Sequence, residues 1–299
     1  MKIAWAENYV LDLPEDHRFP MLKYELIPQQ LIHEGVIQEE EIFNPTDISE
    51  ELILLTHTPE YWDKLKNGNL SKSDIRKIGF PYSAPLIERE CCIASGTIMA
   101  ALFSLQDGIA FNSAGGTHHS FADRGEGFCL LNDIAIAANY LLSINKVSKI
   151  LVVDLDVHQG NGTAKIFEQR EDVFTFSLHG KNNFPMFKER SDLDIALQDE
   201  TTDEEYNAVL KKTLPALINS IRPEIIFYQA GVDVLATDKL GKLALTKEGC
   251  KERDKLVFGL AKSNNVPVCV SMGGGYSERI ADIVDAHCNT FKAAREVYN

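Results

Sequence analysis

The segment Asp154-Leu-Asp156-Val-His158 places two carboxylates and an imidazole at alternate positions directly after an apolar run. Alternate side chains of an extended chain share one face, so Asp154, Asp156 and His158 are predicted to point the same way. Burying these groups is costly unless they are paired or bind a metal. The donor set suits Zn²⁺, with Fe²⁺ or Mn²⁺ as alternatives, and a salt-bridged strand end is the purely structural interpretation.

Asp233 follows a second apolar run, in the segment Gln229-Ala-Gly-Val-Asp233, and is the natural third metal ligand. Taken alone, an aspartate after a strand is typical of a turn or of a helix N-cap. Together with Asp156 and His158 it gives three protein ligands, which leaves one coordination position open for water or substrate. An open position is typical of catalytic zinc sites, because structural zinc sites are closed.

Two adjacent histidines, His118 and His119, follow the glycines Gly115 and Gly116. Adjacent side chains face one cleft only where the backbone is irregular, and glycine permits such a backbone. Beside a metal-bound water, two imidazoles supply a general base and a general acid or electrostatic partner. A polar surface loop is the alternative interpretation of this short motif.

Tyr276 follows three glycines in the segment Met272-Gly-Gly-Gly-Tyr276. A phenol in this position could donate a hydrogen bond to a developing oxyanion. A phosphate-binding glycine loop is the alternative, but the segment has neither the GxGxxG nor the GxxxxGK spacing, so nucleotide binding has little support.

The elements that must position these residues alternate between short apolar runs and amphipathic segments. Strands are predicted at 2–6, 52–56, 109–113, 149–154, 173–178, 224–230 and 266–271. Helices are predicted at 21–34, 59–67, 84–105 and 132–144, after the run 149–154 to about 170, and at 203–221, 246–263 and from 277 onward. This alternation predicts a single α/β domain over residues 1–299, with three α/β/α layers and a mainly parallel sheet. The polar clusters follow four of these strands, at the carboxyl edge where parallel sheets bind ligands.

Composition narrows the classes of function. The chain has 299 residues, of which 44% are hydrophobic and 25% charged, which excludes a disordered, collagen-like or coiled-coil protein. A net charge of −14 disfavours nucleic acid and would suit a cationic substrate or partner. With no apolar leader, no membrane-spanning run and no CxxC pair, we expect a cytoplasmic protein with reduced thiols and no membrane contact.

Four ordered motifs contain these residues: GGTHHSFADRGEGFCLLND at 115–133, VVDLDVHQGNGT at 152–163, YQAGVD at 228–233 and SMGGGY at 271–276. In this order they resemble the zinc-dependent histone deacetylase superfamily, which also includes acetoin-utilisation proteins and acetylpolyamine amidohydrolases. HRFPMLKY at 17–24 and LTHTPEYW at 55–62 are similar to the N-terminal part of that family, and the sequence looks most like bacterial class IV-like members. The resemblance implies the arginase–deacetylase fold.

The resemblance also implies the metal sites. Asp156, His158 and Asp233 match the family's zinc ligands, with Fe²⁺ as the alternative metal. A structural K⁺ or Na⁺ ion is implied beside the zinc, held largely by backbone carbonyls of Asp154, Asp156, His158, Ser177 and Leu178.

Each catalytic role is likewise carried over from the matching position. His119 matches the general base that later protonates the leaving amine, and His118 matches its electrostatic or proton-relay partner. Asp154 matches the carboxylate that orients His118, and Tyr276 matches the phenol that polarises the amide carbonyl. Asn161 stands where class I members have an aspartate. Because an amide stabilises an imidazolium less than a carboxylate does, we expect a lower pKa for His119.

The substrate channel implied by the resemblance includes Gly127, Phe128 and Gly274, with Phe128 packing against the aliphatic stem of the substrate. A second aromatic wall is expected from Phe184 or Phe187. The implied reaction is hydrolysis of an N-acyl amide, with an acylated lysine peptide or protein as substrate.

Two alternatives to this function stay open. The first is an acylated polyamine or another small amide as substrate. The second is a non-catalytic module that binds acyl-lysine. A two-manganese ureohydrolase of the arginase type is disfavoured, because Gly160 and Leu235 stand where that branch needs metal-binding aspartates.

Overall fold

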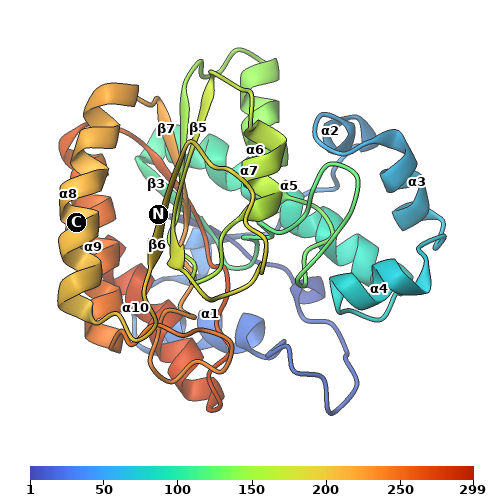
Figure 1. Cartoon of the computed structure of the whole chain (residues 1–299), viewed down its shortest axis with the longest axis horizontal. Coiled ribbons are helices and arrows are strands. Elements are labelled where there is room, and N and C mark those ends of the chain that lie inside the picture. Colours follow the sequence, from blue (N-terminus) through green and yellow to red (C-terminus); the bar gives the residue numbers. More distant parts are fainter.

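The computed structural model describes residues 1–299 and centres on one eight-stranded sheet (Figure 1). The strands are Lys2–Ala4 (β1), Ile42–Phe43 (β2), Ile109–Asn112 (β3), Ile150–Asp154 (β4), Val173–Gly180 (β5), Leu193–Leu197 (β6), Ile225–Gln229 (β7) and Val268–Ser271 (β8). They lie in the order β2-β1-β3-β8-β7-β4-β5-β6, and every neighbouring pair is parallel. The predicted α/β class with a parallel central sheet is confirmed.

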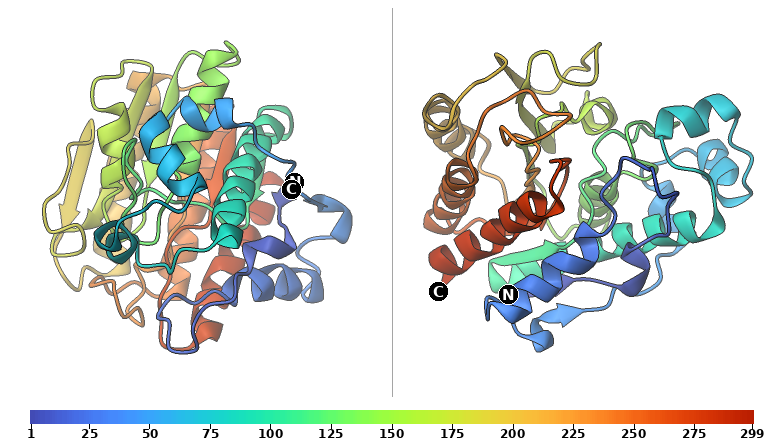
Figure 2. Two further views of the ribbon diagram at one scale, coloured as in Figure 1. Left: turned by 90° about the vertical axis from the view of Figure 1, so that its right-hand side faces the viewer. Right: turned by 90° about the horizontal axis from the view of Figure 1, so that it is seen from below.

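Helices cover both faces of this sheet. They are Lys23–His33 (α1), Glu50–Leu54 (α2), Pro59–Lys66 (α3), Lys72–Ile78 (α4), Ala84–Asp107 (α5), Asp133–Ser143 (α6), Asn161–Phe167 (α7), Asp203–Ile221 (α8), Lys247–Ser263 (α9) and Ile280–Tyr298 (α10). Figure 1 shows α8 and α9 on the side of the sheet opposite α5 and α6, and Figure 2 shows α1 beside α10. No helix is long and apolar enough to span a bilayer, and all six cysteines are free.

The inner strands are apolar on both faces. In β4, Leu151 and Val153 pack into the core beneath α8 and α9, whereas Ile150 and Val152 pack into the core beneath α5 and α6. Because both faces are buried, such a strand is a continuous apolar run rather than an alternating one. This continuity is why these strands were predictable from the sequence.

Helix α8 illustrates how the outer layer forms. It begins with a capping box in which Thr202 and Glu205 satisfy each other's backbone N–H groups, and it buries Tyr206, Leu210 and Leu214 one turn apart. This stripe faces the sheet, so the helix buries one face and leaves the other to solvent.

One predicted strand is wrong. Residues 52–56 were expected to be extended, but they lie in and just after the short helix α2. Ser49 precedes this helix, and Glu50 and Glu51 occupy its first turn, where carboxylates interact favourably with the helix dipole. Only Ile53 of α2 is buried. A short apolar run does not distinguish a strand from one turn of helix, so these flanking signals were decisive.

Candidate active site

Asp156, His158 and Asp233 meet beyond the carboxyl ends of β4 and β7. All three are buried, and their potential ligand atoms lie within 4.8 Å of one another. His158 Nδ1 lies 3.0 Å from Asp156 Oδ1 and 3.1 Å from Asp233 Oδ2. Strand β4 ends at Asp154, so the predicted strand alternation does not extend to His158. Instead, the loop after β4 brings the side chains together.

The backbone orients the two carboxylates. Gly274 N–H donates to Asp156 Oδ2 at 2.8 Å, and Val157 N–H donates to Asp233 Oδ1 at 2.9 Å. Each carboxylate therefore has its other oxygen directed toward His158, an arrangement that pre-orients metal ligands. A Cβ at Gly274 would lie 2.0 Å from Asp233 Oδ2, so only glycine fits there. The residues fit a divalent metal ion with one nitrogen and two oxygen ligands.

The charges of these ligands also fit a metal ion. Burial lowers the pKa of His158, but Asp156 and Asp233 outweigh it and raise the pKa to about 10. Burial and the charge of Asp156 raise the pKa of Asp233 to about 7. Two buried carboxylates this close are both ionised only with a positive charge between them, which is a proton on His158 or a bound cation.

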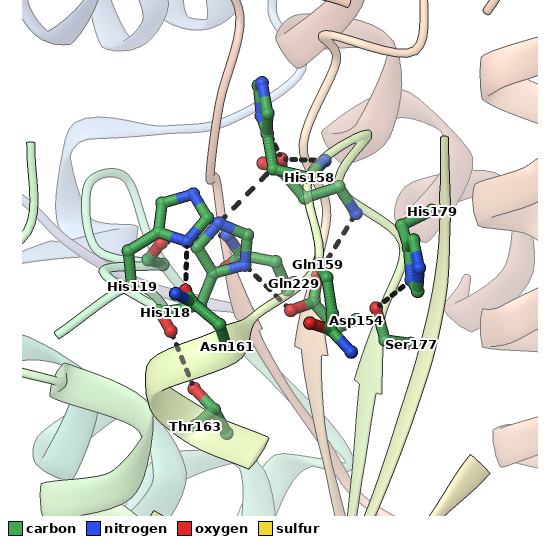
Figure 3. A network of polar contacts seen from close by, with 12 residues as sticks. His118, His119, Asp154, His158, Gln159, Asn161, Thr163, Ser177, His179 and Gln229 are labelled. Carbon is green, nitrogen blue, oxygen red and sulfur yellow. Dashed lines mark hydrogen bonds and ion pairs between the residues drawn. The ribbon is translucent and has the colours of Figure 1, made fainter. Parts of the chain in front are cut away.

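The adjacent histidines have different partners (Figure 3). His118 Nδ1 lies 2.8 Å from Asp154 Oδ2, and His119 Nδ1 lies 2.7 Å from Asn161 Oδ1. The two rings are 4.1 Å apart between centroids. An amide oxygen only accepts, so Asn161 holds the proton of His119 on Nδ1 and leaves Nε2 with a free lone pair. That tautomer is the one a general base needs.

Electrostatics separates the two imidazoles. Burial lowers the pKa of His118, but Asp154 and Asp156 outweigh it and raise the pKa to about 9. Burial, followed by the charges of His118 and His158, lowers the pKa of His119 well below its usual value. One imidazole therefore tends to be cationic and the other neutral, which is a pattern typical of acid–base pairs.

Asn161→Asp should move the acidic limb of the kcat/KM pH profile to higher pH. A carboxylate at position 161 would stabilise the imidazolium form of His119 and so raise its pKa. A general base acts only when neutral, so the variant should lose activity at low pH first. The profile of kcat/KM against pH checks this expectation. An unchanged acidic limb would show that protonation of His119 does not limit activity.

A buried hydrogen-bond network fixes the loop in front of the histidines. Asp133 Oδ1 accepts from Gly116 N–H at 3.0 Å and from Thr117 N–H at 2.8 Å, and its Oδ2 accepts from the Thr97 hydroxyl at 2.6 Å. Gln229 Nε2 donates to the carbonyl of Gly116 at 2.8 Å. Asp133 and Gln229 lie inside the sequence motifs, yet no pattern in the sequence indicated that they position this loop.

Tyr276 lies beside the candidate metal ligands, with its ring centroid 6.5 Å from that of His158. Burial and the carboxylates of Asp233 and Asp156 raise its pKa well above the usual range, so the phenol keeps its proton and remains a donor. Asp238 Oδ2 accepts from Tyr276 N–H at 2.6 Å. Its Oδ1 accepts from the backbone N–H groups of two following residues at 2.8 Å, so Asp238 ties the tyrosine to the loop after β7. Sequence reasoning missed Asp238.

Lys23 supports the glycine loop from the other side. Its side chain is fully buried, and Nζ donates to the carbonyl of Gly273 at 3.0 Å. The ammonium lies 5.2 Å from the ring centroid of Tyr24 and 5.8 Å from that of Tyr276. Burial lowers the pKa of Lys23 to about 8. The residue falls in the segment HRFPMLKY, whose pattern predicts no chemical role for it.

Two aromatic side chains flank the site, and a backbone hydrogen bond fixes the segment that carries one of them. Gly127 has φ +54°, and a Cβ there would lie 2.7 Å from His119 Cδ2. Phe128 N–H donates to the carbonyl of Ile78 at 2.7 Å. The ring of Phe184 lies edge-on to His119 at 4.9 Å between centroids, whereas Phe187 is 86% exposed. Phe184 is therefore the aromatic that lies against the site.

Two further expectations concern cations. Ser177 lies opposite Asp154 in the pairing of β5 with β4, and its hydroxyl contacts His179 Nδ1 at 2.9 Å. Leu178 is part of the core. The K⁺ or Na⁺ site stays a prediction.

A Cβ at Gly160 would lie 2.3 Å from Asp154 Oδ2, so that position has no room for a carboxylate that binds a second metal ion.

Two cavities reach this group of residues. The inner one encloses about 40 Å³ and is lined by Asp156, His158, both histidines of the pair and Tyr276, among others. The outer one encloses about 320 Å³ and opens between Phe128 and Phe184. Two of the candidate metal ligands, Asp156 and His158, thus line the inner end of a channel whose outer part opens between two aromatic rings.

Comparisons with known proteins agree with this geometry. A family model described as "Histone deacetylase domain" matches residues 17–291. An uncharacterized protein of Picosynechococcus sp. is 42% identical over 99% of both chains. Histone deacetylase 2 of Arabidopsis thaliana is 28% identical over 95% of this chain and 76% of its own length. A crystal structure of an HDAC homolog complexed with SAHA is 25% identical, with a TM-score of 0.84, and the match covers 100% of this chain and 88% of that one.

Proposed function

Because this chain belongs to the histone deacetylase family, we propose that it hydrolyses the amide bond of an acylated lysine in a zinc-dependent reaction. The observation that carries the proposal is the meeting of two groups at one small cavity. Asp156 and His158 line this cavity together with the pair His118 and His119, and Asp233 completes the candidate ligand set beside them. A metal site with an adjacent base and acid is the machinery of metal-assisted hydrolysis.

Zinc, when bound, supplies a Lewis acid that polarises the amide carbonyl and lowers the pKa of water. His119 accepts a proton from the attacking water at Nε2 and returns it to the departing amine. His118, held cationic beside Asp154, stabilises the negative charge that develops during attack. Tyr276 donates its phenolic proton in a hydrogen bond to the oxyanion.

The size and lining of the two cavities suit the side chain of a lysine that carries a short acyl group. Phe128 and Phe184 offer apolar walls to four methylenes of a lysine side chain. The inner cavity of about 40 Å³ is small, since a single water needs about 10–15 Å³ measured in this way. We therefore propose acetyl or a similarly short group as the acyl part of the substrate.

Tyr276→Phe should lower kcat by about 10²–10³-fold, the usual cost of losing one oxyanion donor. The phenol is not among the candidate metal ligands, so the metal content of the variant should equal that of the wild type. Steady-state kinetics and elemental analysis of the same sample check both statements. Wild-type kcat in the variant would remove Tyr276 from the oxyanion role.

The proposed function is tested with one lysine peptide that carries acyl groups from acetyl to myristoyl. We expect zinc-loaded protein to turn over the acetyl peptide fastest and to lose activity as the chain lengthens, with His119→Ala as the blank. Turnover that survives in His119→Ala would indicate a contaminating enzyme. If zinc-loaded protein binds the peptides without cleaving any of them, a non-catalytic acyl-lysine-binding module is favoured instead. If it cleaves acetylspermidine in preference to the peptides, a polyamine amidohydrolase is favoured.

A further inference from the structure

The mouth of the channel has the opposite charge to the molecule as a whole. The net charge of the chain is −14, yet no Asp or Glu lines the outer cavity. Its lining instead includes three cationic side chains, Arg18, Lys77 and Lys242. All three residues are exposed. None of them forms an ion pair within the chain. Their charges are therefore available to a ligand.

These cations are attached to the structures that form the channel. The guanidinium carbon of Arg18 lies 5.0 Å from the ring centroid of Phe128, so Arg18 stacks on the channel wall. The carbonyl of Lys77 accepts from Gly127 N–H at 3.0 Å, which ties the end of α4 to the same wall. Lys242 follows Gly241, whose N–H donates to Asp238. The three cations thus come from three separate segments around one opening.

We propose that the amine part of the substrate carries carboxylate groups that bind at this mouth. The inference rests on the proposed function: an acyl-lysine stem between Phe128 and Phe184 leaves the rest of the amine component at the mouth, beside the cations. Charges of one sign in a concave site attract the opposite charge more strongly than isolated surface charges do. The carboxylates are either the α-carboxylate of free acyl-lysine or the side chains of Asp and Glu next to an acyl-lysine in a peptide.

The same arrangement disfavours cationic substrates. The positive charges of a polyamine or of a Lys-rich peptide would lie beside three cations that form no ion pair within the chain. Each exposed charge pair contributes a factor of about 1.5–5 to binding, so three together should give a preference of about 10-fold for an acidic substrate. This preference should weaken as salt screens the charges.

The test compares kcat/KM for one acetyl-lysine peptide flanked by Glu, by Gln or by Lys, with zinc-loaded protein at low and high salt. We expect the order Glu above Gln above Lys, with differences that shrink in high salt. In Lys77→Glu/Lys242→Glu the order should reverse. Lys211→Glu/Lys212→Glu changes the net charge by the same amount, but Lys211 and Lys212 are exposed on α8 and line neither cavity, so it should keep the wild-type order.

A second comparison identifies the source of the carboxylate. Preference for Nε-acetyl-lysine over its α-amide would support the proposal with the α-carboxylate as the group bound. A preference seen only for the Glu-flanked peptide would support the proposal with the side chains of acidic flanking residues as the groups bound. Equal kcat/KM for the three peptides together with equal kcat/KM for Nε-acetyl-lysine and its α-amide, or a preference for the Lys-flanked peptide, would overturn the proposal while leaving the proposed function standing. Failure to cleave any peptide or free acetyl-lysine would overturn the proposed function itself.

Discussion

Asp233→Ala should yield a folded protein that contains no bound metal and has no amidohydrolase activity. The substitution removes the oxygen that lies 3.1 Å from His158 Nδ1, which leaves one carboxylate and one imidazole at the site. Two ligands hold a divalent ion far more weakly than three in a preformed site. Metal content per chain after dialysis, measured by elemental analysis, checks the expectation. Normal zinc content in this variant would exclude Asp233 from the ligand set.

Two further variants make this result specific. Asp233→Asn keeps an oxygen that accepts from Val157 N–H, so it removes the charge with little change to the loop. Asp107→Ala removes an exposed carboxylate at the end of α5 and should retain metal and activity. Thermal unfolding gives a readout independent of activity, because a ligand that binds only the folded state raises Tm. Zinc should raise the Tm of the wild type and of Asp107→Ala, but not that of Asp233→Ala.

His119→Ala should lower kcat by about 10²–10⁴-fold, the range expected for loss of a general base. The ring of His119 contacts Asn161 and Phe184 but is not one of the three grouped ligands, so metal content should stay at the wild-type level. Steady-state kinetics with an acetyl-lysine peptide and elemental analysis of the same preparation measure both quantities. His33→Ala, at an exposed histidine of α1, is the matched control and should behave as wild type.

Two results would contradict the role given to His119. Wild-type kcat in His119→Ala would mean that another group removes the proton from water. Loss of metal together with activity would instead place His119 among the ligands. Tyr276→Phe is a useful comparison, because both variants should lose kcat while keeping their metal.

The central strands and much of the site were predictable because their signals are local. The apolar run at 149–154 corresponds to β4, and the run at 266–271 contains β8. Both strands are buried on both faces, so their residues are almost all apolar from one end to the other. The polar residues after those strands then mark the carboxyl edge of the sheet. The grouping of Asp156, His158 and Asp233 follows from strand ends that meet at one edge.

Elements at the periphery were less predictable. Strand β6 at Leu193–Leu197 was missed, because it lies at the edge of the sheet and its residues alternate between partly buried and exposed. Helix α4 was missed although Ser71 and Asp74 form a capping box and Gly79 ends the helix in a left-handed conformation. Those signals were in the sequence and could have located the helix.

The residues that position the candidate catalytic groups could not be predicted from the sequence. Lys23 contacts Gly273 across 250 residues of chain, and Asp238 contacts the backbone of Tyr276 across 38. Nothing in the local pattern around either residue indicates its partner. The choice between Phe184 and Phe187 also depended on the course of one loop, which turns the first toward His119 and the second to solvent.

The strand order of the sheet has a consequence for the way the protein folds. Strand β8 is the last strand of the chain to be synthesised, yet it lies in the middle of the sheet, between β3 and β7. Until it inserts, the edges of β3 and β7 that face it have no partner, and Gly274 cannot orient Asp156. Contacts between residues so distant in sequence form slowly, because long loops must close first. In refolding, competence to retain a metal ion should therefore return only with the insertion of β8, and a nascent chain that ends before this strand should have none.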